Sequence, residues 1–375
     1  MQTIHPSIVM ILLALCSVAL IAGEAVKPPD GGASRPWVQV RGVYGGFPTE
    51  LIKGGERLED HGINAVFVGA GGINDALVAA AREQGVRLFA EFNTMHVAAY
   101  LKEHPDAAPI GSDGQVSPPP YGWQGVCPTH EGYRRSRMEA FQALLQQRPV
   151  AGVWLDYHHS HASWECADPV LPDTCFCDRC LQRFSKETGV SLPQRPRPEV
   201  ARLLLGEHRG RWVQWRCDVF TDWVREFRKI LDATRPGALL GSFHCPWSET
   251  DMNGALREKL AIDLKAQAAY LDVFSPMPYH ARFGHIKDPG WISRQVAWLG
   301  RHLGVEGKTE ERLKIWPIVQ VADWGEPVPW EQVETVLDQG SRRPATGIMV
   351  FNWGGLRQST EKVKAISRYY VSIRP

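Results

Sequence analysis

The stretch "VAGVWLDY" (150–157) is an almost unbroken run of apolar residues that ends in Asp156 and Tyr157. Such a run is typical of a strand covered on both faces, because a strand with one wet face alternates polar and apolar residues. The stretch therefore predicts a buried strand of a parallel sheet with a carboxyl group at its end. An ionised carboxylate there is costly unless it is paired or used, so Asp156 is a candidate for chemistry. The alternative is an Asp that caps the next loop.

The same kind of run recurs along the chain. Eight runs that predict strands occur at 37–44, 64–70, 86–92, 150–157, 238–244, 271–277, 314–321 and 346–353. Helical periodicity lies between them, at 74–85, 133–148, 212–233 and 330–340. Eight strand-then-helix units predict an α/β fold, a single (β/α)₈ or TIM barrel over residues 37–375.

The long segments after the third and fourth strands, 93–131 and 157–198, predict enlarged loops on the face where such barrels build their sites. A doubly wound open sheet is the alternative fold. The G-x-G-x-x-G loop that often accompanies that fold is absent, and "GAGG" (69–72) is interpreted as a plain turn.

The N-terminus resembles an export signal. Residues 8–21, "IVMILLALCSVALI", form an apolar block that is followed by the small residues "AGEA" and is too short to cross a bilayer comfortably. We expect a signal peptide over 1–24, a flexible leader over 25–36, and export to the periplasm or the cell exterior. Lipidation at Cys16 is the lesser alternative, because Leu15 stands where a lipobox prefers a small residue.

Composition limits the choice of partners. The 375 residues include 44% hydrophobic and 22% charged side chains and carry a net charge of +1, typical of a folded globular protein. Because no long basic run is present, we do not expect a nucleic-acid partner. Fourteen tryptophans suit either sugar stacking or core packing. We expect a carbohydrate partner and no membrane contact beyond the export signal; the oligomeric state is not indicated.

In a barrel, polar residues at the carboxyl ends of strands face the substrate cleft. Here these positions are rich in carboxylates, imidazoles and aromatic rings, which suits cleavage of a glycosidic bond by two carboxyl groups. We expect Asp156 to act as nucleophile or acid/base, with Asp323 or Glu91 as its partner. The expected sugar contacts are Tyr157, His158, His244, Tyr279, His280, Trp324, Asn352 and Trp353.

Histidines and cysteines raise the question of metals. His158, His159 and His161 in "HHSH" could bind a catalytic zinc, although loop histidines that contact substrate are the preferred interpretation. Removal of Cys16 leaves seven cysteines, and "CFCDRC" (175–180) supplies three of them within one turn of chain. With a fourth thiol, these match a structural zinc site. A disulfide such as Cys166–Cys175 is the alternative, because the chain is expected to be exported.

Three segments resemble glycoside hydrolase family 42 β-galactosidases and the related family-10-like glycosyl hydrolases. These are "VCPTHEGYRR" (126–135), "GVWLDY" (152–157) and "CFCDRCLQRFSKETG" (175–189). The resemblance implies a barrel glycosidase with a structural zinc bound by Cys127, Cys175, Cys177 and Cys180. It implies no organic cofactor.

The resemblance has limits. Family 42 enzymes end strand four with Asn-Glu, whereas this chain has Leu155-Asp156, and Gln320 and Asp323 occur where the family has its strand-seven Glu. An Asp at the end of strand four instead resembles the nucleophile of the amylase and α-galactosidase clans. The substrate and the stereochemistry of family 42 are therefore not carried over. The sequence indicates an exported glycoside hydrolase; the alternatives are an inactive carbohydrate-binding barrel and a metal-dependent hydrolase such as a deacetylase.

Overall fold

The run that ends in Asp156 forms β4, Gly152–Asp156, and all five of its residues are buried in the computed structural model. The model describes residues 38–375, so the expected signal peptide, the leader and Trp37 lie outside the described residues. Strand β4 pairs in parallel with β3, Arg87–Asn93, and with β5, Leu239–His244. The prediction of a buried parallel strand is confirmed.

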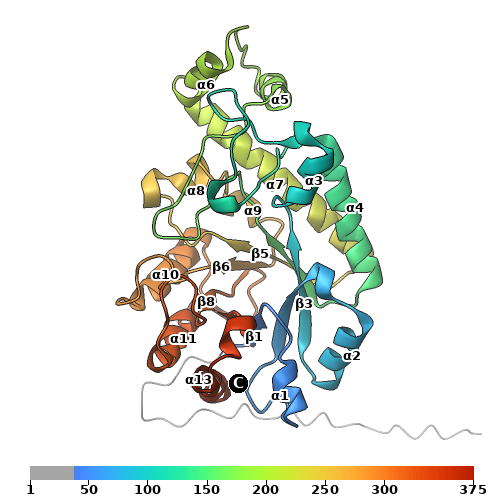
Figure 1. Cartoon of the computed structure of the whole chain (residues 1–375), viewed down its shortest axis with the longest axis vertical. Coiled ribbons are helices and arrows are strands. Elements are labelled where there is room, and N and C mark those ends of the chain that lie inside the picture. Colours follow the sequence, from blue (N-terminus) through green and yellow to red (C-terminus); the bar gives the residue numbers. More distant parts are fainter. Residues whose placement is uncertain (1–37) are drawn as a thin grey trace, which may run out of the picture. The chain divides into compact units, whose positions relative to one another are not determined.

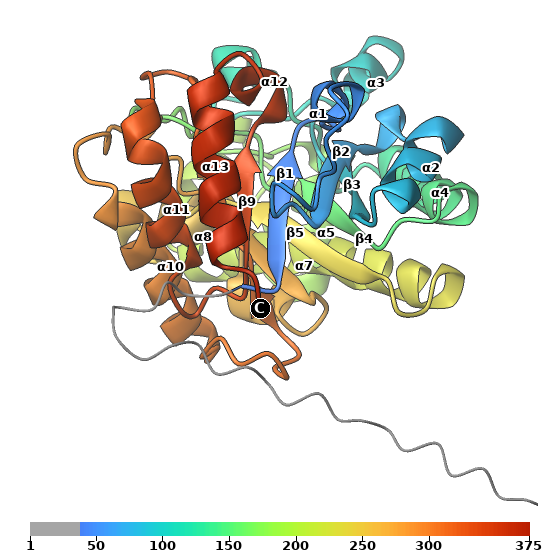
Figure 2. The same cartoon turned by 90° about the horizontal axis from the view of Figure 1, so that it is seen from below.

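The complete sheet has the order β7-β6-β5-β4-β3-β2-β1-β9-β8, and every pairing in it is parallel. Its other strands are β1 Val40–Tyr44, β2 Ala65–Gly69, β6 Val273–Pro276, β7 Lys314–Ile315, β8 Ile318–Gln320 and β9 Gly347–Phe351. Figure 2 shows β1 and β9 side by side.

The predicted seventh strand, 314–321, is divided into β7 and β8 because Pro317 has no N–H to donate. The chain stays hydrogen-bonded on both sides across this break. The backbone N–H of Trp316 donates to the carbonyl of Phe274 in β6, and the Pro317 carbonyl accepts from the N–H of Met349 in β9. Since β7 pairs with β6 and β8 pairs with β9, the divided strand closes the sheet. The predicted (β/α)₈ barrel is thereby confirmed.

Helices cover the outside of the barrel (Figure 1). Those that follow strands are α1 Thr49–Lys53, α2 Asp75–Glu83, α4 Glu131–Gln147, α7 Arg209–Thr234, α8 Ala255–Glu258, α9 Leu264–Gln267, α10 Gly290–Leu303, α11 Val333–Ser341, α12 Trp353–Leu356 and α13 Thr360–Ser372. The enlarged loops predicted after the third and fourth strands are present. They contain α3 Ala98–Glu103 after β3, and α5 Asp178–Thr188 and α6 Arg197–Leu205 after β4.

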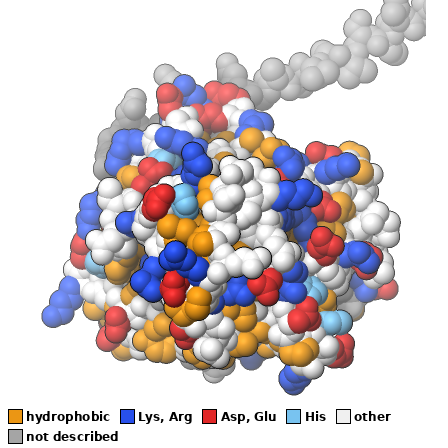
Figure 3. Space-filling model, turned by 90° about the horizontal axis from the view of Figure 1, so that it is seen from above, with side chains coloured by type: hydrophobic (Ala, Val, Ile, Leu, Met, Phe, Trp, Pro, Cys, Tyr) orange, Lys and Arg blue, Asp and Glu red, His pale blue; other side chains and the backbone are white. Residues whose placement is uncertain are grey.

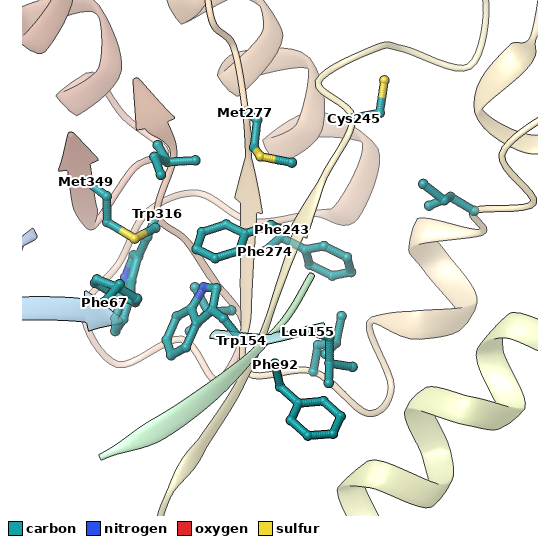
Figure 4. Packing of buried hydrophobic residues seen from close by; sticks show 14 of the residues in the cluster. Phe67, Phe92, Trp154, Leu155, Phe243, Cys245, Phe274, Met277, Trp316 and Met349 are labelled. Carbon is teal, nitrogen blue, oxygen red and sulfur yellow. The ribbon is translucent and has the colours of Figure 1, made fainter. Parts of the chain in front are cut away.

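Large aromatic rings fill the barrel interior. Phe67 stacks on Phe89 with ring centroids 4.7 Å apart, and Trp154 stacks on Trp316 at 5.5 Å. Figure 4 shows Phe67, Trp154, Trp316 and Met349 gathered together. A Cβ on Gly241 would lie 2.3 Å from the Trp154 ring, so the neighbouring strand needs glycine at this position. The interior is a packed core, and the open space lies at the carboxyl ends of the strands.

Charged side chains of both signs are mixed on the surface. Figure 3 shows Lys and Arg side chains interspersed with Asp and Glu over the visible face, without an extended basic patch. None of the helices in the described part of the chain combines the length and the apolarity that a membrane crossing requires.

Candidate active site

Asp156 lies inside the mouth of the barrel. Trp154 fills the interior, and successive side chains of a strand alternate, so Asp156 faces the same side two residues later. Its backbone carbonyl accepts hydrogen bonds from the Thr94 N–H and hydroxyl, each 2.9 Å long. Its carboxylate Oδ1 accepts the Tyr157 N–H at 2.9 Å. The carboxyl group is therefore fixed in place between β3 and the loop after β4.

Glu91 is the nearest acidic neighbour of Asp156. It lies opposite Trp154 in the register of β3 and β4, and its Oε2 accepts the Tyr44 hydroxyl at 2.9 Å. The carboxyl groups of Glu91 and Asp156 are close enough to share a hydrogen bond when one of them is protonated. Burial first, and then the charges of Glu91 and Glu165, raise the pKa of Asp156 well above its usual value. The pair therefore retains a proton more firmly than separate carboxylates would.

Glu165 is a third carboxyl group at this site, and it was missed in the sequence. The preceding residue, Trp164, is buried against Phe283, with ring centroids 6.2 Å apart. The Nε of Arg282 donates to the backbone carbonyl of Glu165 at 2.7 Å. Burial raises the pKa of Glu165 to about 7; the Arg282 charge opposes this rise and the Glu91 charge adds to it.

A cavity of about 330 Å³ brings Asp156 and Glu165 together. One aromatic wall contains Trp123 and Tyr157, whose ring centroids are 5.1 Å apart. The other wall is built around the Phe351 ring, which lies 4.7 Å from Tyr279 and 5.0 Å from Trp324. The lining residues are Tyr44, Gly45, Trp123, Asp156, Tyr157, Glu165, Phe243, Met277, Tyr279, Ile318, Trp324, Phe351 and Asn352.

The structure thus brings together most of the aromatic residues expected from the sequence. The expected residues that line this cavity are Asp156, Tyr157, Tyr279, Trp324 and Asn352. Glu91 lies directly behind Asp156, bonded to Tyr44, which itself lines the cavity. Trp123 belongs to the long loop after β3, and no feature of the sequence singled it out.

Two expected residues from the end of the barrel lie elsewhere, which corrects the sequence analysis. Asp323 does not line the cavity; its side chain is 63% exposed, and its Oδ1 forms an ion pair with the Nζ of Lys362 at 2.6 Å. This ion pair lowers the pKa of Asp323. Trp353 is buried, and its indole N–H donates to Glu50 at 3.0 Å. Neither residue is placed to meet a sugar in this cavity.

The histidines expected at the cleft hold the structure around it instead. His158 hydrogen-bonds to the Phe220 carbonyl, and His161 lies between the Pro118 carbonyl and the Gly125 N–H. Burial lowers the pKa of His158 to about 4.

His244, the last residue of β5, and His280, which follows β6, are also outside the cavity lining. His244 follows the inward-facing Phe243, so it faces away from the barrel interior and packs against Phe274. His280 is fully buried and contacts Gln332. In the described part of the chain, no group of three or more histidine or carboxylate ligands converges on one point, so the catalytic-metal alternative finds no site there.

The four cysteines named by the resemblance do converge. The sulfur atoms of Cys127, Cys175, Cys177 and Cys180 all lie within 4.8 Å of one another, and all four residues are buried. The Cys127 sulfur is 3.5 Å from Cys177 and 3.6 Å from Cys180. All seven described cysteines are free thiols, so the alternative disulfide, Cys166–Cys175, is not formed.

Comparison with known proteins gives a likeness of fold. No family model matches the chain, and no curated protein matches it in sequence. The glycoside hydrolase domain of PgaB (BpsB) from Bordetella bronchiseptica superposes with a TM-score of 0.67 at 13% identity, covering 89% of this chain and 99% of that one.

Two further solved structures have the same barrel. A family 42 β-galactosidase from G. stearothermophilus gives a TM-score of 0.62 at 12% identity, covering 91% of this chain and 58% of that one. The catalytic domain of a β-amylase from Paenibacillus polymyxa gives 0.61 at 9% identity, covering 90% and 99%. At these identities the likeness shows the TIM-barrel fold of glycosidases.

Proposed function

We propose that the protein is an exported glycoside hydrolase that cleaves a glycosidic bond of an oligo- or polysaccharide with paired carboxyl groups. The observation that carries this proposal is that Asp156 and Glu165 line one aromatic-walled cavity at the carboxyl ends of the barrel strands. Two carboxyl groups flanking an aromatic-lined space are what glycosidic bond cleavage requires. The likeness of the barrel to solved glycoside hydrolases supports the same function.

The surroundings of the two carboxyl groups suggest different roles for them. Asp156 is buried beside Glu91, which favours its protonated form. Burial raises the pKa of Glu165 to about 7, and the nearby Arg282 charge opposes this rise and favours the ionised form. A carboxyl group held protonated can donate a proton, while a neighbouring ionised carboxylate can stabilise positive charge. Asp156 therefore protonates the glycosidic oxygen as its bond to the anomeric carbon breaks, and Glu165 stabilises or attacks that carbon.

The aromatic walls would hold the sugar between these acids. Sugar rings stack their C–H faces on indole and phenol rings, and Trp123 and Trp324 belong to two separate aromatic clusters that line the cavity. Arg282 lies over the Trp324 ring, with its guanidinium carbon 4.6 Å from the ring centroid. It thereby connects this wall to the loop that carries Glu165.

A structural zinc is a second part of the proposal. Zinc–sulfur bonds of about 2.3 Å place the sulfurs of a tetrahedral site roughly 3.8 Å apart, close to the separations found here. The Ile110 N–H donates to the Cys175 sulfur at 3.3 Å, and the Thr129 hydroxyl lies 3.1 Å from the Cys180 sulfur. Both contacts suit negatively charged thiolates. None of the four cysteines lines the cavity, so the metal would hold the loops and take no part in the reaction.

The proposed function is tested by incubating the mature protein with a panel of α- and β-linked oligosaccharides and measuring released reducing ends. We expect at least one linkage to be cleaved, because the cavity holds both carboxyl groups that the reaction needs. Binding of a glycan without release of reducing ends, unchanged in Asp156→Asn, would contradict the proposal and favour a carbohydrate-binding barrel.

A further inference from the structure

A groove of about 920 Å³ lies beside the barrel mouth, apart from the cavity described above. Its walls come from the ends of β1, β2 and β3 and from one side of α4. The cavity that holds Asp156 is about one third of this size. The groove is therefore large enough to hold more of a ligand than the cavity itself, within the range of protein ligand sites.

The groove and the cavity meet at the acidic cluster. Gly45 lines both spaces. Tyr44 lines the cavity and Glu91 lines the groove, and the hydrogen bond between these two side chains forms the boundary. Asp156 lies on the cavity side of this boundary. A ligand in the groove would therefore end close to the proposed proton donor.

Glycines keep the groove open. The rim is formed by Gly45, Gly46, Gly69, Gly71 and Gly72, of which the last three belong to "GAGG" (69–72). A Cβ on Gly71 would have no atom within 4 Å, and a Cβ on Gly69 would lie 3.9 Å from the Glu91 Oε2. The stretch interpreted as a plain turn therefore forms a low wall beside Glu91, the acidic neighbour of the proposed proton donor.

Arg137 is one of two arginines in the groove lining. Its guanidinium group lies over the Phe92 ring at 4.3 Å and donates through one terminal nitrogen to the Asn93 carbonyl. These two contacts hold the side chain against the end of β3, beside Glu91.

We propose that this groove binds the part of a glycan chain that extends beyond the sugar unit held in the cavity. This inference rests on the proposed function and specifies its substrate: a polysaccharide or long oligosaccharide rather than a free disaccharide. The lining is small and apolar along most of its length, with separated polar groups such as Arg137 and Gln147. Such a surface suits many weak contacts to a neutral chain better than one strong contact to a small ion.

The test is to fill the groove without touching the acids. Gly71→Trp directs a side chain into open space, and Gly71 does not have the positive φ that would strain a substitution. Gly210→Trp, at an equally open position at the start of α7, is the matched control. We expect Gly71→Trp to raise KM for a polysaccharide or hexasaccharide by about tenfold or more, as expected for the loss of a subsite. KM for a disaccharide should stay within twofold of wild type.

An equal change for long and short substrates, or no change for either, would overturn the groove proposal. Binding separates this result from a failure of the proposed function. The Asp156→Asn protein is run in three native gels, each containing soluble starch, β-1,4-galactan or xylan. The same protein carrying Gly71→Trp or Gly210→Trp in addition is run beside it. Retardation that Gly71→Trp relieves and Gly210→Trp does not would support the groove even if no glycan is cleaved. Absence of retardation in all three gels would count against it.

Discussion

Asp156 shows how a strand can place an acid where its ionised form is disfavoured. The alternation that directs Trp154 into the barrel core directs Asp156 into the mouth, beside Glu91. Its pKa is raised, so in the folded state the ionised form is destabilised relative to the unfolded chain. Stability contributed by this group is fully present below its unfolded pKa and is lost as pH rises toward its folded pKa.

Asp156→Asn is therefore expected to stabilise the protein while it removes the proton donor. The amide can still accept from the Tyr157 N–H, and it can donate to Glu91. We expect Tm at pH 8 to rise by roughly 2–4 °C, with a smaller rise at pH 4. Calorimetric scans across pH measure this difference. A Tm gap that shrinks with rising pH would contradict the assigned environment.

Arg282 should set the pH at which activity begins. In the proposed mechanism Glu165 must be ionised, and its pKa is about 7, so kcat/KM should rise with pH through about 7. Arg282→Met removes the charge that favours the ionised form, so the rise should move to higher pH. Arg282→Lys keeps the charge and should leave the rise close to its wild-type position. A rise at the same pH in all three proteins would exclude Glu165 as its source.

Alternation along strands explains which site residues the sequence could predict. Asp156, Tyr279 and Trp324 lie at or just after the carboxyl ends of buried strands. The expectation that such positions face the substrate cleft therefore identified them. Because side chains alternate, His244 faces outward after the inward-facing Phe243. The expectation for strand ends did not separate inward-facing from outward-facing positions. Glu165 belongs to a long loop with no regular period, so only folding of that loop brings it to the cavity.

At the scale of elements, the cysteine cluster joins the loops after β3 and β4. Cys127 lies between Trp123 and α4, Cys175 and Cys177 lie between Glu165 and α5, and Cys180 lies in the first turn of α5. A metal at the cluster would fasten the two loops that supply Trp123 and Glu165 to the cavity. The loop carries little other regular structure before α5, which is why such a fastening would matter.

Cys177→Ser is expected to lose the zinc and to lower stability. Elemental analysis should show the zinc content falling from about one equivalent per chain to near zero. The free energy of unfolding should fall by about 4 kcal/mol or more, as in the loss of other structural metals. Cys166→Ser is the matched control, because its half-exposed sulfur contacts only the Asp168 carbonyl. The structural role would be contradicted if Cys177→Ser stayed folded and kept its zinc but lost turnover.

The elements themselves could largely be predicted. Continuous apolar runs located each barrel strand, and periodicity located α4 and α7 to within a few residues. The seventh strand was predicted whole, but Pro317 divides it, because a residue without an N–H cannot complete both ladders. The path of the long loops could not be predicted, since they follow tertiary contacts and no repeating pattern.

At the scale of the whole molecule, closure of the barrel is what gathers the site. Asp156, Tyr279 and Asn352 follow different strands around the ring, and only a closed sheet brings them to one cavity. Asp323 also follows a barrel strand, yet it turns outward to Lys362. Sequence position alone therefore gave the right face of the barrel, and of the two acids expected to accompany Asp156 the structure places Glu91 beside it and Asp323 away from it.

The most direct test of the account compares kcat/KM of wild type, Asp156→Asn and Asp323→Asn on the glycan that the panel identifies. Loss of the proton donor should lower kcat/KM by about a thousandfold in Asp156→Asn. Asp323→Asn removes an ion pair to Lys362 that lies outside the cavity lining, so its kcat/KM should stay within about twofold of wild type. An Asp156→Asn protein with the wild-type rate, or an Asp323→Asn protein without activity, would contradict the central claim.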